Sequence, residues 1–115
     1  MFDANFYTTV LPDLVKAECA AGTSDVPVVE VRLADGTTLD VCHIIFFGPD
    51  WLAAACYPSR GPSARLTTEF VRYDLVTRLT VSVQEVQTRK LGFDLVRNST
   101  AMRIGIQPSD QQDVR

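Results

Sequence analysis

One histidine and its neighbours are the residues best equipped for chemistry. His43 is the only histidine of the 115-residue chain; Cys42 precedes it directly, and Asp40 lies three residues before it. A cysteine beside a base can act as a nucleophile. Alternation in a strand, however, places His43 on one face with Leu39 and Ile45, and Asp40 and Cys42 on the other. We therefore predict that the three groups do not converge, that His43 is a hydrogen-bonded structural residue, and that the protein is not an enzyme.

The cysteines give no metal signature. Cys19, Cys42 and Cys56 are odd in number and show no C-x-x-C spacing. A four-ligand site would need all three cysteines and His43 to gather from separate elements. We predict no metal site and no cofactor, with the thiols packed as small apolar groups.

Composition indicates one folded domain with an acidic balance. Hydrophobic residues make up 46% and charged residues 22%, and the formal net charge is -3. These are ordinary globular values, and a negative charge weakens the simplest reason for binding nucleic acid. The N-terminus has no basic region, which argues against a signal peptide. No apolar run is long enough to span a membrane. We predict a cytoplasmic protein with reduced thiols.

The hydrophobic period changes from a helical to a strand pattern near residue 28. Residues 12–21 are predicted to be helical, since Leu11, Leu14, Val15 and Cys19 form one apolar stripe and Pro12 suits a first turn. Strands are predicted at residues 28–33, 37–47, 51–57, 67–73 and 77–83. Asp35-Gly36 marks a tight hairpin between the first two, and the break "DLV" suits a single turn between the last two.

The remaining residues are predicted to extend the domain, which we place at residues 1–106. "LGFDLV" and "AMRIGI" could pair as a hairpin across "RNST", over residues 91–106. Residues 107–115 form a polar tail. The fold class is thus mainly β with an N-terminal α-helix: a five-stranded open barrel, spanning residues 28–83, with an extra C-terminal hairpin.

This order resembles the Sm, LSm and Hfq superfamily of small barrels. The helix "PDLVKAECA", the pair "VVEVRLADGTTLDV", the bend "IIFFGPDWLAAACY" and the pair "FVRYDLVTRLTV" carry the resemblance. Two departures are visible. "LDVCHI" has no glycine in the middle of the second strand, and Tyr73-Asp74 stand where the basic tip pair of the Hfq proteins would fall.

The resemblance implies binding of single-stranded RNA at one end of the barrel. There Tyr73 would stack on a base while arginines meet phosphate. The residues predicted for this site are Arg72, Tyr73, Arg78, Arg60 and Arg65. Asp74 opposes this reading, because a carboxylate repels phosphate.

The resemblance also implies a closed ring of identical subunits. Family members pair the fourth strand of one subunit with the fifth strand of the next, which satisfies otherwise bare strand edges. The predicted contact residues are Phe70, Val71, Leu79 and Val81. Two functions stay open: a ring that binds RNA, and a protein-interaction or structural ring that has lost the basic tip. An enzyme built on Cys42 and His43 is the third alternative.

Overall fold

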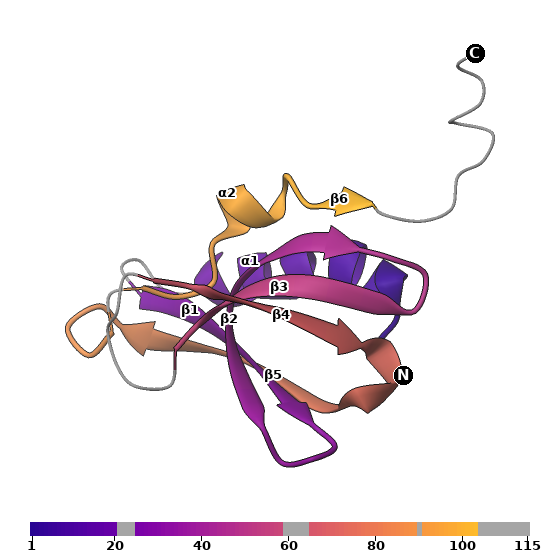
Figure 1. The fold of residues 1–115 in the computed structure, drawn as a ribbon. Coiled ribbons are helices and arrows are strands. Elements are labelled where there is room, and N and C mark those ends of the chain that lie inside the picture. The colour runs from indigo at the N-terminus through magenta and orange to yellow at the C-terminus, as the bar shows by residue number, and fades with distance from the viewer. Residues whose placement is uncertain (21–24, 59–64, 90, 104–115) are drawn as a thin grey trace.

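The fold is seen in a computed structural model, which describes residues 1–20, 25–58, 65–89 and 91–103. A helical N-terminal segment is followed by five antiparallel strands that curve around a shared core (Figure 1). The prediction of a mainly β protein with an N-terminal helix and a five-stranded open sheet is confirmed. In the described part of the chain, every helix is too short or too polar to cross a membrane.

The N-terminal helix starts earlier than residue 12. A π-helical turn, η1 (Phe6–Val10), leads directly into α1 (Leu11–Ala20), and the Leu11 N–H donates to the Phe6 carbonyl five residues back. Tyr7, Leu11 and Val15 are buried at strict four-residue steps. Such spacing drifts away from a 3.6-residue period, and the wider π turn takes up the difference. Pro12 therefore lies in the first turn of α1, and the wide π-helical turn η1 comes directly before α1.

The first hairpin forms at the Asp-Gly pair, as predicted. It joins β1 (Asp25–Leu33) to β2 (Thr38–Phe47). Gly36 has a φ of +92°, which favours glycine, and the Asp35 carboxylate accepts a hydrogen bond from the Thr37 N–H at 2.9 Å. That hydrogen bond lowers the pKa of Asp35.

The sheet runs in the order β4-β3-β2-β1-β5. The remaining strands are β3 (Trp51–Tyr57), β4 (Thr67–Arg72) and β5 (Val76–Glu85), and the 3-10 turn η2 (Tyr73–Leu75) joins the last two. All neighbours within this order are antiparallel. The strands β4 and β5 are consecutive in the chain but lie at the two ends of the sheet, which leaves the barrel open between them.

Strand β2 serves two sets of neighbours because it bends. Its pairing with β3 shifts register between Val41 and His43 and again between Ile44 and Phe46. Each shift is a β-bulge, which bends the strand and increases its twist. Pairing between β1 and β2 ends at Val29 and Val41. Beyond that point the edge of β2 that faced β1 is available to another segment.

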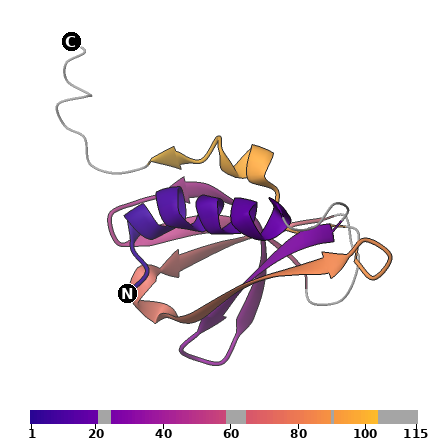
Figure 2. The ribbon, with the colours of Figure 1, turned by 180° about the vertical axis from the view of Figure 1, so that it is seen from behind.

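Residues 91–103, which we call the C-terminal segment, occupy that edge. The Phe93 N–H donates to the Pro27 carbonyl at 2.8 Å, and the Asp94 N–H donates to the Cys42 carbonyl at 2.7 Å. The short helix α2 (Leu95–Asn98) follows, and β6 (Met102–Arg103) then pairs in parallel with Phe46 and Phe47 of β2. Figure 2 shows this segment running beside α1.

The predicted C-terminal hairpin is therefore wrong for the described residues. "LGFDLV" forms no strand, because Phe93 is inserted into the core and Asp94 caps α2 by accepting from the Arg97 N–H at 3.0 Å. Residues 104–106 of the predicted return strand, residue 21 of the predicted helix and the tail at 107–115 lie outside the described residues.

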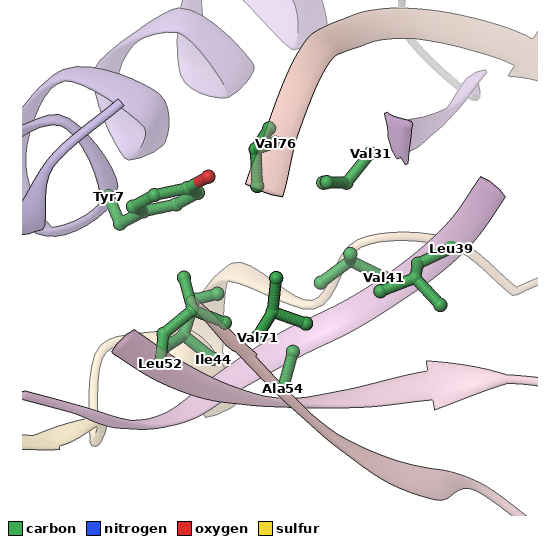
Figure 3. Close-up of a pocket in the computed structure, with 9 residues that line it drawn as sticks. All are labelled: Tyr7, Val31, Leu39, Val41, Ile44, Leu52, Ala54, Val71 and Val76. Carbon is green, nitrogen blue, oxygen red and sulfur yellow. The ribbon is translucent and has the colours of Figure 1, made fainter. Parts of the chain in front are cut away.

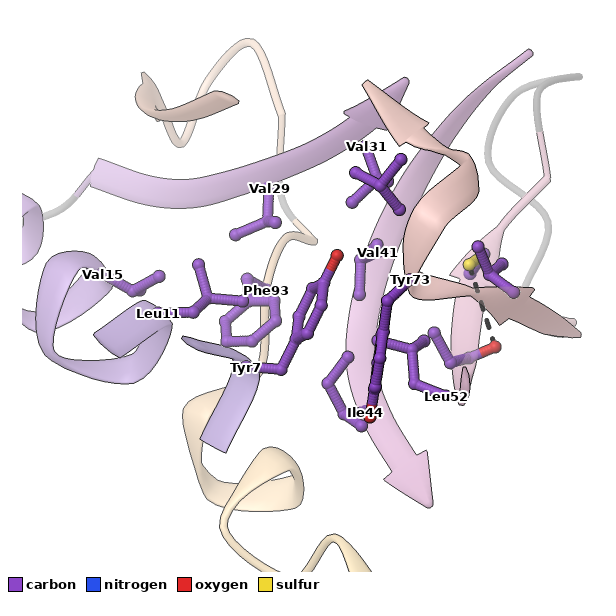
Figure 4. Packing of buried hydrophobic residues seen from close by; sticks show 14 residues of the cluster. Tyr7, Leu11, Val15, Val29, Val31, Val41, Ile44, Leu52, Tyr73 and Phe93 are labelled. Atoms are coloured by element: carbon purple, nitrogen blue, oxygen red, sulfur yellow. Dashed lines mark hydrogen bonds between the residues drawn. The ribbon is translucent and has the colours of Figure 1, made fainter. Parts of the chain in front are cut away.

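The main core lies between the helix and the concave face of the sheet. Helical Tyr7, Leu11 and Val15 meet side chains from every long strand, and Phe93 enters from the C-terminal segment (Figure 4). The strand residues of this cluster are Val29, Val31, Val41, Ile44, Leu52, Ala54, Cys56, Val71 and Val76, and the turn η2 adds Tyr73. Burial on this scale is the main source of stability in a domain of this size.

Candidate functional site

The predicted RNA tip is built around an ion pair. Arg72 ends β4, and its guanidinium donates two hydrogen bonds to the Asp74 carboxylate, at 3.1 and 2.8 Å. Both side chains are more than half exposed. A bidentate pair of this kind satisfies the guanidinium fork. Arg72 therefore meets solvent with its charge already matched by Asp74.

Tyr73 does not present its ring to a ligand. The side chain is 1% exposed, and its hydroxyl donates to the Gly48 carbonyl at 2.7 Å. Its ring stacks on Tyr7, with centroids 5.6 Å apart and an angle of 20° between the planes. The predicted base-stacking role is therefore wrong, because a base cannot reach either face of this ring.

The other predicted arginines lie on separate elements. Arg78 is exposed on β5, directly opposite Arg32 of β1. Arg72 stands on β4, opposite Trp51 of β3, so Arg72 and Arg78 lie on opposite edge strands. Arg65 is exposed just before β4, and Arg60 lies outside the described residues.

The four predicted interface residues divide into outward and inward side chains. Phe70 on β4 is 71% exposed and lies against Trp51, with ring centroids 6.1 Å apart. Val71 points the other way and is buried in the core. Leu79 and Val81 on β5 are half-buried and pack against the core. Of these four residues, only Phe70 exposes a large apolar side chain to solvent.

Cys42 and His43 do meet, contrary to the alternation argument. The thiol sulfur lies 3.2 Å from His43 Nδ1. The cause is the bulge in β2: Val41 pairs with Cys56 and His43 pairs with Ala55, so Cys42 is the extra residue. A bulge places two successive residues opposite one and interrupts the alternation of faces. The expectation that the two side chains point to opposite faces is wrong for this reason.

A network of polar side chains surrounds this pair. Arg89 donates to the Asp40 carboxylate at 2.6 Å, and its guanidinium lies over the ring of Tyr57, 5.5 Å from the centroid. The Tyr57 hydroxyl donates to the Gly92 carbonyl at 2.6 Å. Burial raises the pKa of Tyr57, and a hydrogen bond with Cys42 raises it further. Asp40 thus belongs to a structural network with Arg89 and does not orient His43.

The surroundings of His43 favour its neutral form. Burial lowers the pKa of its imidazole, the charge of Arg97 lowers it further, and Asp94 acts in the opposite direction. A neutral imidazole that faces a thiol with Nδ1 can accept its proton. The pair therefore has the geometry of a nucleophile and its base, although Cys42 itself is buried.

A small apolar cavity lies inside the barrel. It is lined by Tyr7, Val31, Leu39, Val41, Ile44, Leu52, Ala54, Val71 and Val76 (Figure 3). The space open to the centre of a water-sized molecule is ≈ 10 Å³, about the room that one water needs. The Tyr7 hydroxyl points into it without a hydrogen-bond partner among the described residues. Burial raises the pKa of this hydroxyl.

Sequence reasoning missed the residues that join the C-terminal segment to the sheet. Arg89, Gly92 and Asn98 carry contacts of this kind, and Asn98 accepts from the Ile44 N–H across 54 positions. No local sequence pattern predicts hydrogen bonds between residues this far apart in the chain. In the part of the chain that the structure describes, no group of three or more His, Cys, Asp or Glu residues could hold a metal ion.

Comparisons with models of protein families, with curated proteins and with solved structures give no match for this chain.

Proposed function

We propose that this protein is a non-enzymatic, Sm-like barrel that associates with copies of itself through its two open strand edges. The observation that carries the proposal is the sheet order, which leaves β4 and β5 as edges at either side of one gap. Bare edges are templates for pairing with another chain. A head-to-tail pairing of β4 with β5 of the next copy, repeated around an axis, removes every edge by closure.

The side chains along β4 support an interface rather than a solvent face. Phe70 is 71% exposed on this edge strand, beside the half-buried Trp51. Large exposed aromatic side chains are enriched at protein interfaces. An N-terminal helix before a five-stranded sheet in this order also fits the superfamily named above. The missing basic pair at the turn favours a protein-interaction or structural ring.

Native mass spectrometry at micromolar concentration tests this association. We expect a defined oligomer that a Phe70→Glu variant weakens at least ~10-fold, because a charge would be buried in the interface. Val96→Glu is the matched control, since Val96 is 79% exposed on α2, away from both edges. A wild-type protein that is monomeric at all concentrations tested would contradict the proposal.

A second candidate function is binding of single-stranded RNA, and one observation favours it. Arg32 and Arg78 are directly opposed on β1 and β5, and both are exposed. Like charges in this position repel each other. Neither forms an ion pair with a described carboxylate, although Glu30 lies on the same face one pair further along. An anion such as a phosphate would relieve the repulsion.

Titration with a fluorescent oligonucleotide distinguishes the two candidates. If RNA binds, Arg78→Ala should weaken binding more than Arg72→Ala, because Asp74 already neutralises Arg72. Raising the salt should weaken binding as counterion release requires. Absence of binding at low salt, where phosphate contacts are strongest, would exclude RNA binding and leave the protein-interaction or structural ring as the remaining candidate.

A further inference from the structure

The bulge in β2 gives this fold a thiol and an imidazole in direct contact. Cys42 Sγ and His43 Nδ1 are 3.2 Å apart. With the ring proton on Nε2, the Nδ1 lone pair faces the thiol, and a neutral imidazole of this kind is the form that can take a proton. The proposed self-association makes no use of this pair.

The thiol lies beneath the C-terminal segment rather than in the main core. Cys42 is 3% exposed, yet it does not belong to the cluster of core side chains between the helix and the sheet. Its carbonyl accepts from the Asp94 N–H at 2.7 Å. The hydroxyl of Tyr57 is hydrogen-bonded to the Gly92 carbonyl, and Tyr57 lies close enough to Cys42 for a hydrogen bond between the two side chains to raise the pKa of Tyr57. Covering residues and thiol are therefore neighbours.

The C-terminal segment, which covers Cys42, is held more firmly at its start than along the rest of its length. At its start, Phe93 is buried in the core and Gly92 lies tightly against the backbone of Pro27. After Asp94, the Asn98 side chain accepts from Ile44, β6 adds two residue pairs with β2, and the Arg103 guanidinium lies over the Phe47 ring. Leu95 and Ala101 are only partly buried against the edge of the core. A terminal segment held in this way opens at a lower free energy than the whole domain.

We propose that Cys42 is a thiol-modification site for small disulfides, exposed when the C-terminal segment opens, with His43 as the base that takes the thiol proton. His43 Nδ1 accepts the proton of Cys42, and Sγ attacks one sulfur of the disulfide. The sulfur–sulfur bond breaks, a mixed disulfide forms on Cys42, and the second sulfur leaves as a thiolate. The small disulfide is reduced as Cys42 is oxidised, and the imidazolium returns its proton to solvent.

The charges around the pair come from three parts of the fold. The network of Asp40 and Arg89 lies on the β2 and β5 side, and Tyr57 extends from β3. Asp94 and Arg97 act on His43 from the C-terminal segment itself. Opening of this segment therefore exposes the thiol and at the same time changes the electrostatic surroundings of its base.

Cys56 provides an internal control for the test. It is 2% exposed on the neighbouring strand, and burial, followed by the charge of Glu69, raises its pKa to about 12. It belongs to the main core, so its thiol becomes reachable only when the domain unfolds. The two buried cysteines thus separate local opening from global unfolding within one molecule.

The experiment treats the native full chain with an aromatic disulfide at increasing urea and maps each modified cysteine by mass spectrometry. We expect Cys42 to react at least ~100-fold faster than Cys56 in the absence of urea, with a rate that hardly depends on urea, because local opening exposes little surface. Cys56 should react along the global unfolding curve. Equal rates and equal urea slopes for the two cysteines would overturn the proposal.

Two variants test whether the C-terminal segment covers Cys42 and whether His43 is the base. Asn98→Ala should accelerate modification of Cys42 by ~10-fold or more without changing Cys56, once rates are corrected for global stability. His43→Gln should slow Cys42 by about tenfold, below the effect of a positioned enzyme base. If Asn98→Ala leaves the rate of Cys42 unchanged, the segment is not the cover, and if His43→Gln does so, His43 is not the base; either result refutes the proposal as stated.

Discussion

The side-chain oxygen of Asn98 accepts a hydrogen bond from the backbone N–H of Ile44 at 2.7 Å, although 54 positions separate the two residues in the chain. Asn98 is polar, yet it is buried in the structure, with 7% of its surface exposed. It meets β2 between its two bulges, where the strand has left β1 and has not yet reached β6. A side chain here supplies the acceptor that a sheet neighbour would otherwise provide.

Replacing Asn98 with alanine should therefore destabilise the fold. The Ile44 N–H would be left buried without an acceptor, which costs about 1–3 kcal/mol. Urea denaturation followed by circular dichroism measures the change. Ser99→Ala is the control, because Ser99 is exposed and its hydroxyl bonds only locally to Val96. An effect of the same size in both variants would show that the bond to Ile44 is not the cause.

The two stacked tyrosines should respond in opposite ways to loss of their hydroxyl groups. Tyr7→Phe removes a buried hydroxyl with no partner among the described residues, so stability should be unchanged or should rise by up to about 1 kcal/mol. Tyr73→Phe removes the bond to the Gly48 carbonyl and should cost about 1 kcal/mol. Thermal unfolding of both variants under one condition makes the comparison. A loss in Tyr7→Phe equal to that in Tyr73→Phe would contradict it.

Two glycines should differ sharply in their tolerance of alanine. A Cβ at Gly92 would lie 2.0 Å from the Pro27 carbonyl oxygen, so the C-terminal segment would have to move away from β1. A Cβ at Gly36 meets nothing within 4 Å, and there only the positive φ disfavours alanine. We expect a cost above about 3 kcal/mol for Gly92→Ala and about 1–2 kcal/mol for Gly36→Ala. Chemical denaturation ranks the two, and the reverse order would refute the close packing of Gly92.

The protein should become less stable as the pH is lowered through the titration range of His43. Its pKa in the folded protein is lowered from 6.5, chiefly by burial. Below pH 6.5 the unfolded chain thus binds a proton that the folded protein still resists, so acid favours unfolding until the folded pKa is passed. In His43→Gln this part of the pH dependence should vanish. Urea midpoints between pH 7.5 and 5.5 provide the measurement, and identical slopes in both proteins would exclude His43.

Most of the barrel could be predicted because its strands obey simple alternation. Val29 and Val31 point into the core while Glu30 and Arg32 face solvent, and Asp35-Gly36 forms the turn that the pair favours. These signals are local, so five strands and their order of appearance follow from them. The predicted bend in the second strand is present as two bulges.

The candidate sites could not be predicted, because they depend on deviations and distant contacts. A bulge has no period, so nothing in "LDVCHI" indicates that Cys42 is the extra residue beside His43. Tyr73 looks exposed in a turn between strands, but its burial depends on Tyr7 from the other end of the chain. The apolar residues around Phe93 have the sequence pattern of a strand. In the structure, however, Phe93 packs in the core and holds the C-terminal segment against β1 and β2.

The split in β2 also sets an order in time. Pro27, Cys42 and Ile44 receive their last hydrogen-bond partners from residues 93–98, which a ribosome adds only after all five strands have been made. A nascent chain can thus curl its strands early but cannot complete β2 until those residues emerge. Completion of β2 therefore waits for residues 93–98, and a chain truncated before them would have a barrel with part of one strand edge left unpaired.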